Sequence, residues 1–132
     1  MTSAAEAIPV SKAALWSGRI MSAIPVVLLL FSGVLKLLKP ASVLQSFAKF
    51  GYPETLIAML GIVEILCVIA YVIPRISILG AILVTGYLGG ATATNVRVGD
   101  PSAILTVLLG VFAWGGLYLR EARIRALIPL RS

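Results

Sequence analysis

The residue best suited to chemistry in this sequence is Glu64, an acid in the middle of the apolar stretch from Pro53 to Arg75. That stretch is long enough to cross the ~30 Å hydrocarbon core of a bilayer. Counting ~1.5 Å per residue from Glu54 places Glu64 roughly 15 Å deep. A carboxylate there costs about 2.5 kcal/mol or more to insert, which makes it a candidate functional residue. Glu64 is our candidate catalytic residue, as a proton donor or acceptor; the structural alternative is that it only hydrogen-bonds a neighbouring helix.

Five polar residues from other parts of the chain are candidate ligand-binding residues: Lys36, Tyr87, Asn95, Arg97 and Asp100. With four spans, all but Tyr87 fall near the outer end of the bundle, above Glu64. We expect a polar funnel that holds a small polar or anionic head group near Lys36 and Arg97, with an apolar portion deeper. Asp100 precedes Pro101 and has the alternative role of capping the next helix.

The sequence leaves open whether Lys36 and Glu64 meet. Lys36 lies near the end of the first span, so roughly 12 Å along the membrane normal separates its backbone from that of Glu64. A lysine side chain covers only part of that distance. A direct ion pair therefore requires a shifted register or a bridging water.

The composition excludes a soluble protein. Of the 132 residues, 60% are hydrophobic and 12% are charged, with a mean hydropathy of +1.07. This predicts an all-α integral membrane bundle in one domain, residues 1–132. The net charge is +6, and the basic residues lie at span ends, where they can contact lipid head groups. This charge therefore does not indicate a nucleic-acid partner.

Histidine is absent and Cys67 is the one cysteine, so the sequence predicts no metal site and no dithiol chemistry. No cofactor is evident. A quinone is compatible with the sequence, because it needs only a hydrogen-bond donor and an apolar slot.

Hydropathy and turn residues define the expected elements. The predicted spans are residues 16–38, 54–73, 76–95 and 102–119, with a short amphipathic helix at 42–50 and a basic tail at 120–132. Ser42 and Gln45 form a capping-box pattern at the start of the amphipathic helix, and Gly51 is its expected stop. This helix is either a lid over a cavity or a simple connection.

Small residues indicate which helix faces pack. In the first span they form a stripe that packs closely or lines a polar cavity: Gly18, Ser22, Pro25, Ser32 and, ending it, Lys36. Gly61, one turn before Glu64, lets another helix approach that acid. Gly86 and Gly90, with Gly80 and Gly89, predict tight helix packing, either within the chain or with a protein partner or homo-oligomer.

Basic residues predict the topology. One side of the membrane collects Lys12, Arg19, Arg75, Arg120, Arg123, Arg125 and Arg131, and the other collects Lys36, Lys39, Lys49 and Arg97. This asymmetry predicts that both termini are cytoplasmic.

Five ordered blocks within residues 16–120 resemble the DoxX-like family of small four-span bacterial membrane proteins. They are RI in the first span, FSGVLKLLKP, FAKFGYPETL, LGIVEILCVIAYVIPR and LGAILVTGYLGGATATNVRVGDPS. The resemblance implies a four-helix bundle in the bacterial cytoplasmic membrane, with Lys36 and Glu64 as the family's intramembrane charges. The family takes its name from a membrane subunit of a thiosulfate:quinone oxidoreductase. Many relatives carry histidine where this chain has Asn95, which weakens a metal or general-base role there.

Three functions fit the sequence. The first is a non-catalytic or accessory membrane subunit associated with a redox or transport complex. The second is a small membrane enzyme or a quinone- or small-molecule-binding subunit, with Glu64 as proton donor or acceptor and with Lys36 and Arg97 binding the polar group. The third is an oligomeric transporter for a small solute.

Overall fold

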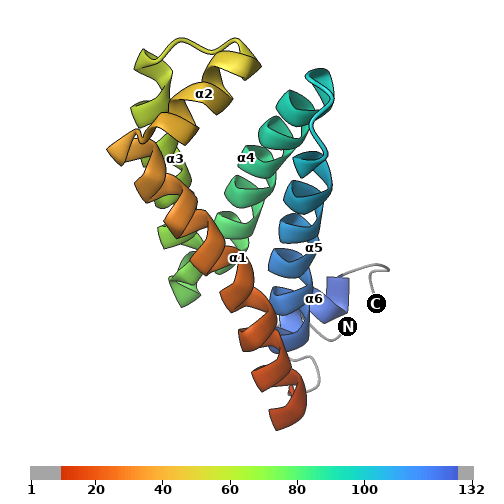
Figure 1. Cartoon of the computed structure of the whole chain (residues 1–132). Coiled ribbons are helices and arrows are strands. Elements are labelled where there is room, and N and C mark those ends of the chain that lie inside the picture. Colours follow the sequence, from red (N-terminus) through yellow and green to blue (C-terminus); the bar gives the residue numbers. More distant parts are fainter. Residues whose placement is uncertain (1–9, 128–132) are drawn as a thin grey trace.

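The computed structural model describes residues 10–127, and every regular element in that part of the chain is helical (Figure 1). The elements are α1 (Lys12–Leu38), α2 (Ala41–Phe50), α3 (Thr55–Val72), the 3-10 turn η2 (Pro74–Ile76), α4 (Ser77–Arg97), α5 (Ser102–Arg120) and α6 (Ala122–Leu127). Helices α1, α3, α4 (together with η2) and α5 are long and apolar enough to cross a membrane. The predicted all-α membrane bundle, with a short helix between its first two spans, is confirmed.

The four long helices form a ring. Helix α1 packs on α3 and α5, and α4 packs on the same two helices from the other side. Helix α2 lies across one end of the ring, while α6 and the first turns of α1 lie at the opposite end (Figure 1). The predicted basic tail, residues 120–132, is described as far as Leu127, and residues 128–132 lie outside the described part of the chain.

Local signals explain the boundaries of α1 and α2. Helix α1 begins at Lys12, ahead of the expected residue 16, because the Ser11 hydroxyl accepts the backbone N–H of Ala14 at 3.1 Å and caps the helix. Helix α2 begins at Ala41, directly after Pro40, and has no side-chain cap. The predicted capping box of Ser42 and Gln45 is therefore wrong, since Ser42 already lies inside the first turn.

Glycines let α1 cross from α5 to α3. Near its start, a Cβ on Gly18 would lie 2.6 Å from the Gly116 carbonyl oxygen of α5. Near its end, a Cβ on Gly61 of α3 would lie 2.8 Å from Lys36 Cβ and 2.9 Å from the Gly33 carbonyl oxygen. Both approaches are too close for a side chain, which confirms the role expected for Gly61.

The glycines of α4 do not share one role. Gly80 packs directly on the α3 backbone at Tyr71, so tight packing is confirmed there. At Gly86, Gly89 and Gly90 an added Cβ would meet nothing within 4 Å. For these three glycines, the prediction of tight packing within the chain is wrong, because all three are exposed on the surface of α4.

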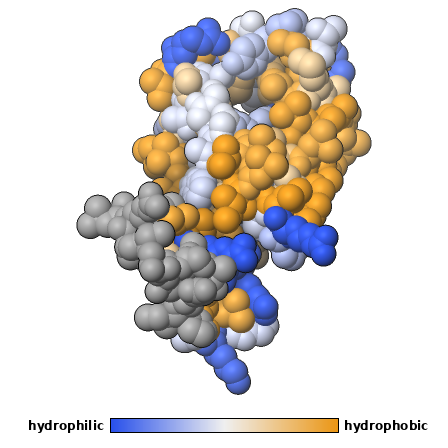
Figure 2. All heavy atoms as spheres, turned by 180° about the vertical axis from the view of Figure 1, so that it is seen from behind, coloured by the Kyte–Doolittle hydropathy of each residue, from blue (hydrophilic) through white to orange (hydrophobic). Residues whose placement is uncertain are grey.

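The outer surface is apolar, and a modest core lies inside the ring. Figure 2 shows hydrophobic side chains covering the middle of the molecule, with hydrophilic groups gathered toward its ends. The buried core cluster draws on α1, α3, α4, α5 and α6, and consists of Leu29, Cys67, Val68, Tyr71, Ala81, Val84, Leu88, Leu109, Ala113, Leu117 and Ile124. Such an outward-facing apolar surface is suited to contact with lipid.

Candidate functional site: an intramembrane ion pair beside a cavity

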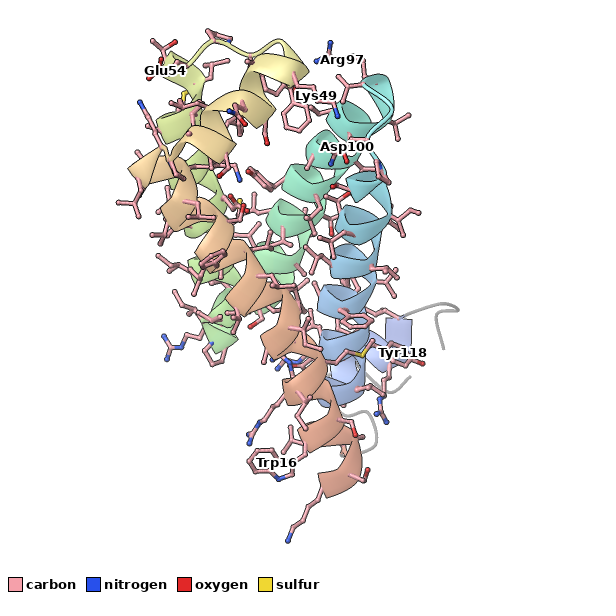
Figure 3. The ribbon with its side chains drawn as sticks, in the orientation of Figure 1. Trp16, Lys49, Glu54, Arg97, Asp100 and Tyr118 are labelled. Atoms are coloured by element: carbon pink, nitrogen blue, oxygen red, sulfur yellow. The ribbon has the colours of Figure 1, made fainter. Side chains whose placement is uncertain are left out.

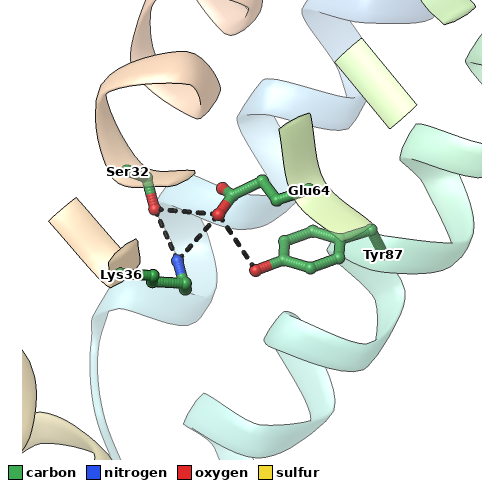
Figure 4. Close-up of polar contacts among 4 residues, drawn as sticks. All are labelled: Ser32, Lys36, Glu64 and Tyr87. Carbon is green, nitrogen blue, oxygen red and sulfur yellow. Dashed lines mark hydrogen bonds and ion pairs between the residues drawn. The ribbon is translucent and has the colours of Figure 1, made fainter. Parts of the chain in front are cut away.

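Glu64 is buried within the bundle and forms a direct ion pair. Its side chain is 2% exposed, and its Oε2 lies 2.8 Å from Lys36 Nζ. The Ser32 hydroxyl donates to the same oxygen at 3.3 Å, and the Tyr87 hydroxyl donates to it at 3.1 Å (Figure 4). Lys36 Nζ also donates to Ser32 Oγ at 2.6 Å. Three helices thus converge on one carboxylate oxygen.

The packing of α1 on α3 brings the two charges together. Gly33 and Gly61 allow the two backbones to touch, and Lys36 lies one turn beyond Gly33 while Glu64 lies one turn beyond Gly61. The sequence left open whether Lys36 and Glu64 meet. The structure shows that they do, because α1 and α3 approach each other at their glycines and the two side chains reach each other directly.

A cavity of about 640 Å³ lies beside this ion pair, toward α2. Its wall is mostly apolar and includes Lys36, Glu64, Tyr87 and Asn95 among the predicted site residues. The other lining residues are Leu28, Leu29, Ser32, Phe47, Phe50, Tyr52, Leu56, Leu60, Gly86, Leu88, Gly90, Ala91, Thr94, Leu105, Thr106 and Leu109. The volume lies in the range of small-molecule sites, which are generally apolar with a few polar groups that fix orientation.

Asn95 is a buried polar residue whose side chain has no partner. The residue is 7% exposed, and its carboxamide takes part in none of the hydrogen bonds among residues 10–127. No fully enclosed side-chain polar atom in this part of the chain lacks a partner, so the amide must face open space, and Asn95 lines the cavity. The amide can therefore donate to and accept from a molecule in the cavity.

Arg97 and Asp100, also predicted to bind ligand, do not line this cavity. The Arg97 guanidinium donates to the carbonyl of Phe50 at the end of α2. Asp100 caps α5 by accepting the backbone N–H of Ser102 at 2.9 Å, and Lys49 Nζ lies 3.6 Å from its other oxygen. The Ser102 N–H, with a smaller contribution from Lys49, lowers the pKa of Asp100. Figure 3 shows Lys49, Arg97 and Asp100 gathered where α2 meets α4 and α5.

Helix α2 closes the cavity from above. Phe47 is buried, and its ring lies 5.7 Å from that of Phe50 and 5.9 Å from that of Tyr52. The Tyr52 hydroxyl bonds to Thr94 Oγ1 of α4 at 2.6 Å. Sequence reasoning missed this bond, although the threonine-rich end of α4 was a signal for it. Of the two sequence-based alternatives for this helix, the lid fits its position.

A second polar network, which sequence reasoning missed, fastens the end of the bundle opposite α2. The Tyr71 hydroxyl donates to the Ala113 carbonyl at 2.6 Å and bonds to Ser22 Oγ at 2.8 Å. Arg120 Nε donates to the same Ser22 oxygen at 3.2 Å. Tyr71 is 2% exposed and joins α1, α3 and α5. This network is structural, since all of its groups are paired.

The available chemistry at the cavity is hydrogen bonding to an uncharged group. Lys36 and Glu64 neutralise each other, so a charged ligand head would lack a counter-ion. One carboxylate oxygen, Glu64 Oε1, accepts none of the bonds in Figure 4, and the Asn95 amide is unpaired. Lys36 Nζ lies 6.0 Å from the ring centres of both Phe47 and Tyr87. In residues 10–127, no group of three or more metal-ligating side chains is placed to hold an ion.

These features define a polytopic membrane protein with an ion pair inside its helical bundle and a cavity beside that pair. The chain belongs to the DoxX-like family, whose model matches residues 20–116, a range that begins within α1, ends within α5 and includes every residue that lines the cavity. No curated protein and no solved structure matches the chain.

Proposed function

We propose that this protein binds an amphiphilic small molecule inside the membrane, and that the cavity is its binding site. The observation that carries the proposal is the unpaired Asn95 amide in the wall of an apolar cavity that also holds the Lys36–Glu64 pair. The Asn95 amide faces the cavity and makes no hydrogen bond within the protein, so it is available to a ligand. A ligand with a polar group and an apolar body fits a cavity that has a few polar groups in a mostly apolar wall. A quinone is one molecule of this class.

The experiment is to purify the full-length protein in mild detergent and to identify retained small molecules by native and small-molecule mass spectrometry. We expect a compound in the wild type that is depleted at least about tenfold in Asn95→Leu and in Glu64→Gln, a factor equivalent to one lost hydrogen bond. Asn95→Leu is the sharper variant, because no bond within the protein is lost with it.

Thr85→Val is the matched control. Thr85 lies on the same helix, but its hydroxyl bonds to the Ala81 carbonyl and to Trp114, away from the cavity. It should retain the wild-type amount of compound. A wild-type protein that retains nothing, or equal retention in all four proteins, would refute the proposed function.

We further propose that this binding serves a larger redox or transport complex in the bacterial cytoplasmic membrane, with both chain termini in the cytoplasm. The sequence has no histidine and a single cysteine, so electron transfer would require a partner protein. A proton-transfer role for Glu64 belongs to the same proposal. Recovery of a partner at fixed stoichiometry from native membranes would support it, while a protein that is always isolated alone would count against it.

A further inference from the structure

The wall of the cavity is not equally dense on all sides. On the α1–α5 side it carries the side chains of Leu28 and Leu105, which are 42% and 51% exposed, and under α2 it carries aromatic rings. Along α4 it includes Gly86 and Gly90, which have no side chains at all. Both glycines are exposed, and an added Cβ at either would meet nothing within 4 Å.

The helical positions on α4 show where this gap lies. Tyr87 and Thr94 point to α3 and its preceding loop, because their hydroxyls bond to Glu64 and Tyr52. At 3.6 residues per turn, Gly86 and Gly90 fall between that direction and the lipid-facing side of α4. Figure 2 shows a hollow near the α2 end of the face opposite α1. The gap therefore opens sideways, between α3 and α4, toward the membrane.

At the α2 end of the cavity, polar contacts hold the covering helix in place. Three polar contacts hold α2 and its following loop against the α4–α5 end: Arg97 to the Phe50 carbonyl, Tyr52 to Thr94, and Lys49 to Asp100. Phe47 and Phe50 lie beneath them. Lys36 and Arg97, the two basic groups expected to hold an anion, are already engaged by Glu64 and by the Phe50 carbonyl.

We infer that the cavity exchanges an uncharged, lipid-soluble ligand directly with the membrane, through a portal between α3 and α4 that Gly86 and Gly90 keep open. The inference rests on the proposed binding function and adds the class of ligand and its route. A head group that both donates and accepts a hydrogen bond, such as a hydroxyl, matches Glu64 Oε1 and the Asn95 amide. Because Gly86 and Gly90 have no side chains, they leave the wall of the cavity open at this point.

The probe is a decanol that carries a photoreactive diazirine, added to the protein in lipid nanodiscs. Flashes at set times label the cavity, and peptide mass spectrometry gives the rate of labelling; a chase with plain decanol gives the rate of release. We expect Gly86→Leu and Gly90→Leu to slow both rates at least about tenfold while equilibrium labelling stays within about twofold, since a blocked portal changes kinetics and not affinity. Decyl sulfate that carries the same diazirine should label far less than the alcohol, because it brings an unpaired charge.

Gly89→Leu is the matched control. Gly89 is exposed with equal space around it, but it does not line the cavity, so its rates should equal those of the wild type. Lys49→Ala combined with Arg97→Gln removes two of the contacts that hold α2 and changes no residue of the cavity wall. This variant should exchange the probe at the wild-type rate.

The outcomes separate this inference from the proposed function. No cavity labelling in the wild type would refute binding itself. Labelling with unchanged rates in Gly86→Leu and Gly90→Leu would leave binding in place and overturn the portal. Faster exchange in the loosened α2 variant would place the route on the water side and overturn the inference. Equal labelling by decyl sulfate would overturn the uncharged class of ligand.

Discussion

At the scale of single residues, Glu64 is accommodated in the membrane because its counter-ion is packed against it. Lys36 lies 2.8 Å away, and two hydroxyl donors complete the shell around one carboxylate oxygen. A buried pair gives back in mutual attraction much of what its desolvation costs, so the pair as a whole adds little to stability. Removing one partner is a different matter, because the remaining charge is then buried alone.

This asymmetry gives a prediction for the ion pair. Lys36→Met should lower the free energy of unfolding by about 3–5 kcal/mol, the usual cost of breaking a buried pair from one side. Adding Glu64→Gln to Lys36→Met should recover most of that loss, because the uncompensated charge is gone. Unfolding titrations with sodium dodecyl sulfate in mixed micelles measure both. Additive losses from the two changes would show that the pair is not coupled.

At the scale of elements, some glycines bring two helices into close contact, whereas others face open space. Gly18 and Gly116 hold α1 on α5, Gly61 brings α3 to α1, and Gly80 brings α4 to α3. Small residues allow this close approach, which is the main source of attraction between helices in lipid. The same residue type at Gly86 and Gly90 faces open space, so glycine has two opposite roles along one helix.

Two glycines of α4 provide a matched test of these roles. Gly80→Ala should destabilise the bundle by about 1–3 kcal/mol, because its new methyl group would overlap the backbone at Tyr71. Gly89→Ala should be neutral or stabilising by up to about 1 kcal/mol, since alanine is the better helix former and has room there. Thermal unfolding in detergent compares them. Equal effects in the two variants would contradict the packing described for α4.

At the scale of the whole molecule, the bundle is tight at one end and open at the other. The Ser22–Tyr71–Arg120 network joins α1, α3 and α5 at the tight end. At the other end the helices spread around the cavity, and α2 lies over them (Figure 1). Because the contacts that hold the four helices together lie at the tight end, the open end can leave space for a ligand without weakening them.

The orientation of this molecule in the membrane can be tested directly. With both termini cytoplasmic, green fluorescent protein fused after residue 132 should fluoresce, and alkaline phosphatase at the same place should be inactive. In truncations that end in the loop of residues 98–101, the two reporters should exchange behaviour, because phosphatase folds only outside the cytoplasm. Active phosphatase at the C-terminus would reverse the proposed topology and place α2 on the cytoplasmic side.

The sequence by itself determined the four apolar spans, the amphipathic helix that ends at Gly51 and the intramembrane position of Glu64. These follow from hydropathy and from turn residues, which act locally. It also indicated that Gly61 admits a neighbouring helix, since a glycine beside a buried charge has few other uses.

Only the tertiary structure decided which residues meet. The Lys36–Glu64 contact depends on the angle at which α1 crosses α3, and residue counting along a span does not contain that angle. The same holds for Gly86 and Gly90, whose surroundings depend on how far α3 and α4 have separated, and for Arg97, which contacts α2 instead of the cavity. Periodicity fixes the face of a helix on which a residue lies, whereas the neighbour opposite that face is set by the packing of the whole bundle.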